Sequence, residues 1–236
     1  MRRLLRALNA LLKGRSLPTR QTVLIGITFA AAYGLCMSSF GAWSPERAVM
    51  PLVGAMKAPL VLALTTLVCV PAFWGLCGAT GRSDWFRVAL KCVSESQAVG
   101  AVALAALGPL VVVGYLAGIG EATALVLNAF AFAIAIAAIA AQRALWTRLR
   151  KLMGRGGAPA RLLACWFVLY GFVGVQVAWM VRPVIVPRDE PFGLLRDEPL
   201  TNGYVAVARV VWAAINDSLG GSVQPRDEAD HLEPYL

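Results

Sequence analysis

Five long apolar stretches dominate this sequence, and each is long enough to cross a lipid bilayer as a helix. A hydrocarbon core about 30 Å thick is spanned by roughly 20 apolar residues in helical conformation. The stretches are Val23–Trp43, Pro59–Ala79, Ala98–Ile119, Ala122–Ala141 and Leu162–Val186. Charged residues make up 15% of the chain, whereas a soluble domain carries about 25%. The predicted fold class is therefore an all-α, polytopic membrane protein with about five transmembrane helices plus interfacial amphipathic helices.

The basic residues gather beside alternate ends of these stretches. The first stretch is preceded by Arg2, Arg3, Arg6, Lys13, Arg15 and Arg20. Between the second and third stretches lie Arg82, Arg87 and Lys91. Between the fourth and fifth lie Arg143, Arg148, Arg150, Lys151, Arg155 and Arg161. This alternation follows the positive-inside rule, so the net charge of +9 indicates membrane topology and not nucleic-acid binding. We expect a bacterial inner (cytoplasmic) membrane protein with a cytoplasmic N-terminus and an exported C-terminus. Anionic lipid at the cytoplasmic face would add about 1 kcal/mol of affinity per nearby basic residue.

Three segments follow from this layout. Residues 1–20 are predicted to hold a cytoplasmic basic amphipathic helix, because leucines recur at helical spacing between basic residues, as in helices that lie on a membrane surface. Residues 21–186 make up the five-span transmembrane domain. Residues 187–236 form an acidic, exported segment with one amphipathic helix over Tyr204–Leu219.

Two further short helices are predicted beside the spans. The outer loop begins with Ser-Pro-Glu, which is typical of a helix N-terminus. It predicts a separate helix over Pro45–Lys57, either on the outer surface or dipping into the membrane, with Pro59 separating it from the second span. A second cap at Ser83 begins a helix expected to lie along the inner surface, with Cys92 in the cytoplasmic loop.

Polar side chains are sparse in the predicted span interiors, and ionisable ones are not expected there. Ionisable residues deep in spans mark ion paths and proton relays, so the pattern disfavours a proton- or sodium-coupled transporter. Asn128 and Gln176 are the main amides at depth, and we expect them to bond across helices or, alternatively, to contact a solute. Lys57, Glu121 and Arg182 lie at the outer margins.

Small residues give the fourth span a face suited to close packing. Ala133, Ala137 and Ala141 recur at intervals of four, which places them on one side of a helix. Such faces let helix backbones approach closely in lipid. The fourth span is therefore expected to be buried among other helices, either within the protomer or in an oligomer.

The sequence contains no catalytic constellation that we recognise. Its one histidine, His231, lies near the C-terminal end, so a two-histidine metalloprotease motif is excluded. No span holds an aspartate, and no Gly-rich phosphate loop is present. The five cysteines include no C-x-x-C pair, so neither a zinc site nor a disulfide is expected. We predict no catalytic residues, no cofactor and no metal.

The last span ends in the distinctive stretch Tyr170–Pro183. Gln176, Trp179 and Pro183 follow roughly one helix face, and glycines at 171 and 174 would allow close packing. Trp179 and Arg182 are typical of an anchor at the membrane interface. The alternative is that this polar helix end organises the outer loop or a partner. The candidate structural or partner-contact residues are Lys57, Asn128, Gln176, Trp179, Arg182 and Pro183.

These motifs resemble those of a group of bacterial multi-span membrane proteins. The shared elements are a basic N-terminal helix, a K-x-P-L entry to the second span with a C-x-P-x-F-like end, and a G-x-Q-x-x-W-x-x-R-P signature in the last span. They are matched here by Lys57, Pro59, Leu60, Cys69, Pro71, Phe73, Gly174, Gln176, Trp179, Arg182 and Pro183. Some members of that group carry an actin-binding label of the WH2 type. The five-span layout is also loosely similar to Yip-type proteins. Neither resemblance implies a reaction.

The sequence therefore favours a non-catalytic integral membrane subunit or anchor of a larger membrane assembly. Its expected partners are the lipid bilayer and either further copies of itself or other membrane subunits, and no nucleic acid. An oligomeric channel or passive permease is the alternative, and a lipid-acting membrane enzyme is the third hypothesis.

Overall fold

The computed structural model describes residues 2–39, 48–79, 81, 83–116, 123–153, 157–181, 204–205 and 212. The chain divides into two compact units, Met1–Pro199 and Leu200–Leu236. In the second unit, residues 204, 205 and 212 are helical, and the rest of the predicted Tyr204–Leu219 helix lies outside the described residues.

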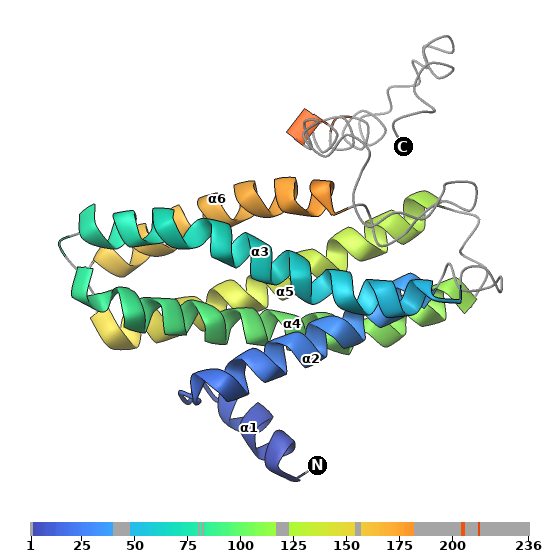
Figure 1. Cartoon of the computed structure of the whole chain (residues 1–236), viewed down its shortest axis with the longest axis horizontal. Coiled ribbons are helices and arrows are strands. Elements are labelled where there is room, and N and C mark those ends of the chain that lie inside the picture. The colour runs from blue at the N-terminus through green and yellow to red at the C-terminus, as the bar shows by residue number, and fades with distance from the viewer. Residues whose placement is uncertain are drawn as a thin grey trace. The chain divides into compact units, whose positions relative to one another are not determined.

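The described part of the first unit is almost entirely helical and contains no strand, which confirms the predicted fold class (Figure 1). Its elements are α1 (Arg2–Leu12), α2 (Thr19–Ser38), α3 (Met50–Ala79), η3 (Ser83–Trp85), α4 (Phe86–Leu116), α5 (Thr123–Met153) and α6 (Gly157–Met180). The helices α2 to α6 are long and apolar enough to cross a membrane, as expected of a multi-pass membrane protein.

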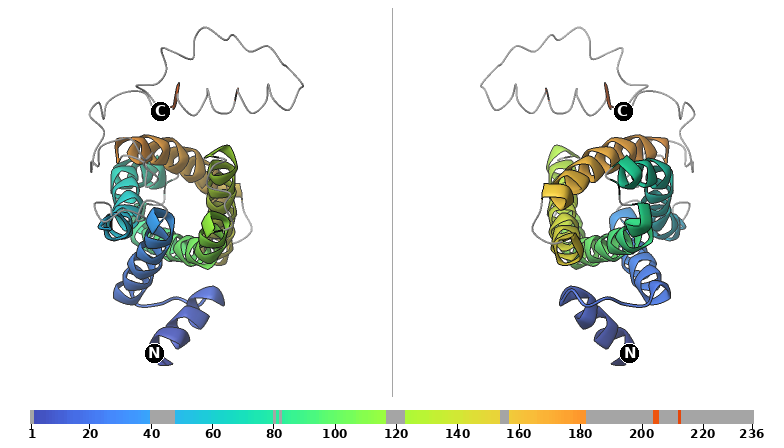
Figure 2. Two further views of the ribbon diagram at one scale, coloured as in Figure 1. Left: turned by 90° about the vertical axis from the view of Figure 1, so that its right-hand side faces the viewer. Right: turned by 90° about the vertical axis from the view of Figure 1, so that its left-hand side faces the viewer.

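The five long helices form a closed ring. In order around the ring, α2 packs on α4, α4 on α5, α5 on α6, α6 on α3, and α3 back on α2. Figure 2 looks along these helices and shows α1 lying outside the ring. Because the chain order differs from the ring order, residues far apart in sequence become neighbours.

The predicted outer helix over Pro45–Lys57 is not a separate element. Residues from Met50 onward form the first turns of α3, which continues unbroken through Pro59 and Pro71. A proline inside a helix removes one backbone hydrogen bond and normally kinks or breaks the helix. Transmembrane helices tolerate it because neighbouring helices and local adjustments satisfy the freed groups.

The helix expected along the inner surface is likewise the first part of α4. Ala89, Cys92 and Val93 are buried, and they belong to the main apolar core. Cys92 therefore lies inside the bundle and not in a loop. The amphipathic pattern correctly indicated one apolar face, but that face packs on other helices instead of on lipid headgroups.

The main core joins four helices near one end of the ring. Phe73 of α3 meets Trp166 of α6 edge to face, with ring centroids 4.8 Å apart. Trp166 also contacts Tyr170, one turn along, at 5.3 Å. Buried side chains from α4 and α5, including Val93 and Leu145, complete this cluster.

Small residues bring two pairs of helices into close contact. The expected burial of Ala133, Ala137 and Ala141 is confirmed, and a Cβ at Gly100 of α4 would lie only 3.2 Å from the Cβ of Ala141. At the α2–α3 crossing, a Cβ on Gly34 would overlap the carbonyl oxygen of Gly54. Both crossings depend on the small-residue packing that membrane helices commonly use.

Candidate functional site

A buried ion pair links α4 to α5. The Nε atom of Arg148 lies 2.8 Å from Oε2 of Glu95, and the two side chains are 7% and 4% exposed. Both residues lie within helices that qualify as candidate spans. Both residues lie outside the predicted spans Ala98–Ile119 and Ala122–Ala141, in the parts by which α4 and α5 extend beyond them. Arg148, expected in a loop as a topology determinant, therefore lies inside a helix and is buried.

The same two side chains also hold the N-terminal segment. Oε1 of Glu95 accepts hydrogen bonds from the Ser16 hydroxyl at 3.0 Å and from the Leu17 backbone N–H at 3.1 Å. Nη2 of Arg148 donates to the carbonyl oxygen of Leu11 at 3.0 Å. We call Glu95, Arg148, Leu11, Ser16 and Leu17 the charged latch, because it ties the end of α1 and the linker to α4 and α5.

The chemistry of the charged latch is that of a structural clamp. Burying a charge is costly unless the charge is paired and hydrogen-bonded, and both oxygens of Glu95 accept bonds here. A carboxylate engaged in this way is held in place by its three partners. An apolar cluster of Leu11, Leu17, Ile25 and Ala98 packs beside it.

Sequence reasoning missed the charged latch because its parts are distant along the chain. Glu95 and Arg148 are 53 positions apart, and Leu11 is 137 positions from Arg148. The available signal was the acidic residue within the otherwise apolar, helical run that leads into the third span. Several basic residues could have been the partner of this acidic residue, and no regular spacing in the sequence identifies Arg148 as that partner.

A second polar contact crosses the ring. The Tyr170 hydroxyl of α6 donates to Oε1 of Gln97 on α4 at 3.3 Å, although these helices are not neighbours in the ring. Thr66 of α3 lies beside the same hydroxyl. Three helices thus share one polar contact, which fixes their rotation about their own axes.

The residues predicted as a site are spread over several places. Lys57 is 2% exposed within α3, and its predicted place at the outer margin of the span stays a prediction. Gln176 and Trp179 are partly buried on α6. The side chain of Asn128, together with Arg182 and Pro183, lies outside the described residues. Of the two glycines in the stretch Tyr170–Pro183, Gly174 faces Thr65 of α3, whereas Gly171 faces open space.

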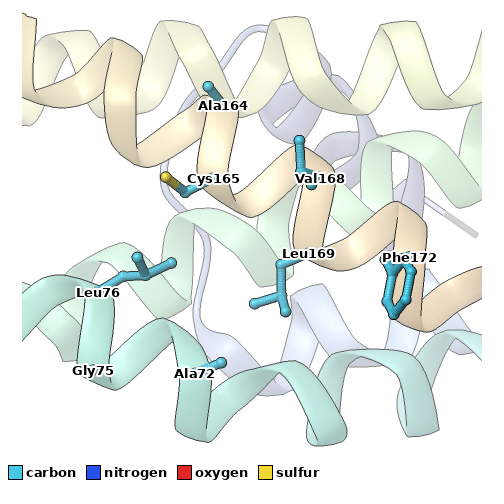
Figure 3. Close-up of a pocket in the computed structure, with 8 residues that line it drawn as sticks. All are labelled: Ala72, Gly75, Leu76, Ala164, Cys165, Val168, Leu169 and Phe172. Atoms are coloured by element: carbon cyan, nitrogen blue, oxygen red, sulfur yellow. The ribbon is translucent and has the colours of Figure 1, made fainter.

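An apolar groove runs along the outer face between α3 and α6. Its volume is about 760 Å³, and Figure 3 shows the lining side chains from both helices. They are Ala72, Gly75, Leu76, Ala164, Cys165, Val168, Leu169 and Phe172. Most of these side chains are exposed, and several are small enough to admit another helix.

Metal-ligating side chains do not gather anywhere in the described part of the chain: no group of three His, Cys, Asp or Glu residues is found there. No family model matches the chain, and neither does any curated protein or solved structure. The resemblance to the bacterial multi-span group therefore stays a prediction, and function is argued from the residues.

Proposed function

We propose that this protein is a non-catalytic integral membrane subunit or anchor that assembles with further copies of itself or with other membrane proteins. The observation that carries the proposal is the groove between α3 and α6, where the small residues Ala72, Gly75 and Ala164 are exposed. Helices associate in lipid chiefly where small residues allow such close approach. The main apolar core, which includes Phe73 of α3 and Trp166 of α6, packs behind that surface.

The proposed location is the bacterial inner membrane, with the N-terminus in the cytoplasm and the C-terminus exported. The support is the distribution of charge. The first turns of α2, α4 and α6 and the last turns of α5 carry basic residues, as the positive-inside rule expects of cytoplasmic helix ends. Anionic lipid at that face is the proposed bilayer partner.

The experiment that tests the proposal is mild extraction from native membranes, followed by mass determination of the intact particle and identification of co-purifying proteins. The proposal expects a particle heavier than the 25.1 kDa chain after subtraction of bound lipid and detergent. A lone monomer with no partner would contradict it.

Passage of a small solute is the second candidate function, and one observation favours it. Thr65, Trp166 and Gln142 each bury a polar atom that has no hydrogen-bond partner among the described residues. Ordered water commonly satisfies groups of this kind, which would give the bundle a hydrated interior. Solute flux into liposomes that carry the pure protein, reduced by Gln176→Leu, is the expected result. Flux equal to that of empty liposomes would rule this function out.

A further inference from the structure

The last turns of α5 carry a basic pocket that the charged latch does not use. Trp146, Thr147, Arg150 and Lys151 line it, and its volume is about 350 Å³. The guanidinium carbon of Arg150 lies 5.3 Å from the centre of the Trp146 ring. This cation–π contact holds the guanidinium in place before any ligand arrives.

The turn after α1 meets the same pocket. Gly14 adopts a left-handed conformation with φ of 69°, and a Cβ built there would lie 3.7 Å from Nζ of Lys151. The ammonium group of Lys151 therefore lies beside this turn. Lys13 and Arg15, the exposed neighbours of Gly14 in sequence, add two more positive charges to the turn.

Within the described residues, acidic side chains are few. Asp84 and Glu95 are the only acidic residues within the described ranges, and Glu95 is engaged by Arg148 in the charged latch. The exposed ammonium and guanidinium groups of the pocket are therefore accessible to an anionic ligand. A phosphate group fits them, because Arg and Lys both bind phosphate oxygens strongly.

The position of the pocket indicates the source of that phosphate. Arg150 and Lys151 lie in the last turn of α5, at the end of its candidate membrane span. The pocket is therefore expected where a membrane helix meets the polar interface, a level at which tryptophan is enriched. Leu4, Leu5 and Leu12 of α1 are exposed and offer apolar surface for acyl chains. Basic pockets at such positions bind the headgroups of anionic lipids.

We propose that Arg150, Lys151 and Trp146, with the turn at Gly14, form a binding site for the headgroup phosphate of an anionic phospholipid. The site rests on the proposed membrane location but not on the proposed assembly. It would bind lipid equally in a monomer or in an oligomer, so the two proposals fail separately.

The test measures lipid retention by the full-length protein with native mass spectrometry, in mixed micelles of phosphatidylcholine with phosphatidylglycerol. The wild-type protein is expected to retain phosphatidylglycerol in preference to phosphatidylcholine. The variant R150Q/K151Q is expected to bind phosphatidylglycerol at least about 10-fold more weakly, because it loses both charge-assisted hydrogen bonds to the headgroup phosphate. Each single variant is expected to fall between these values.

The matched control is R87Q/K91Q, which removes the same charges from the first turns of α4 beside Trp85. It is expected to retain phosphatidylglycerol as the wild-type protein does. Equal losses in both double variants would mean diffuse attraction and would overturn the site. Inorganic phosphate is added in a separate arm, and displacement of the lipid at millimolar concentration would assign the pocket to a soluble phosphate instead.

Discussion

The stability of this fold is expected to depend strongly on the buried ion pair between Glu95 and Arg148. Replacing Glu95 with alanine would leave the Arg148 guanidinium buried without its counter-ion. Removing one partner of a buried ion pair typically costs about 3–5 kcal/mol of folding stability. We expect Glu95→Ala to lower the free energy of unfolding of the detergent-solubilised protein by this amount, measured with a chemical denaturant.

The control for this prediction replaces both charges. Glu95→Leu combined with Arg148→Met should destabilise the protein by less than the sum of the two single changes, because no unpaired charge is left behind. Alanine at Arg161, which is exposed on α6, should change stability by about 0.5 kcal/mol or less. Additive effects at Glu95 and Arg148 would show that the charged latch is not energetically coupled.

The docking of α1 can be tested with two adjacent leucines. Leu11 is fully buried and Leu12 is 56% exposed. Leu11→Ala should weaken the docking of α1 by about 2 kcal/mol or more, and so raise the population of the undocked helix roughly 30-fold. Trypsin cleavage after Lys13 and Arg15 is expected to accelerate accordingly. Leu12→Ala should leave the cleavage rate unchanged, and an equal effect of both substitutions would contradict the docked orientation.

The crossing of α2 and α3 depends on two glycines with no room for a side chain. A Cβ on Gly54 would overlap the Ser38 hydroxyl, and such overpacking typically costs about 1–3 kcal/mol. We expect Gly54→Ala to lower the thermal midpoint of the purified protein. Gly78→Ala is the matched control, because nothing lies near that position and alanine favours a helix by about 0.5–1 kcal/mol. A higher midpoint for Gly54→Ala would disprove the close crossing.

The elements that sequence could predict are those with a local signature. Apolar length predicted the five long helices, and the four-residue spacing of alanines predicted the buried face that includes Ala137. The prediction at the start of α3 was wrong because of Pro59. A proline normally ends a helix in water but can be accommodated inside a helix of a membrane bundle. The charged latch could not be predicted, because its partners come together only through the ring order of the helices.

At the scale of the whole molecule, the ring has an uneven outer surface. Its α3–α6 side presents a groove whose lining includes small residues such as Gly75 and Ala164, whereas the exposed part of α5 presents larger side chains such as Ile139. Lipid acyl chains readily cover an apolar surface that has no groove. We interpret the groove as the side at which the molecule meets another membrane helix.

Photo-crosslinking in intact membranes tests this interpretation most directly. A photoreactive amino acid is placed either at Val168 in the groove or at Ile139 on α5, positions that are 68% and 60% exposed. A membrane subunit should give a discrete protein adduct from Val168, either with a second 25.1 kDa chain or with another subunit, and lipid adducts alone from Ile139. Lipid adducts alone from both positions would contradict the proposal that this protein works as part of a membrane assembly.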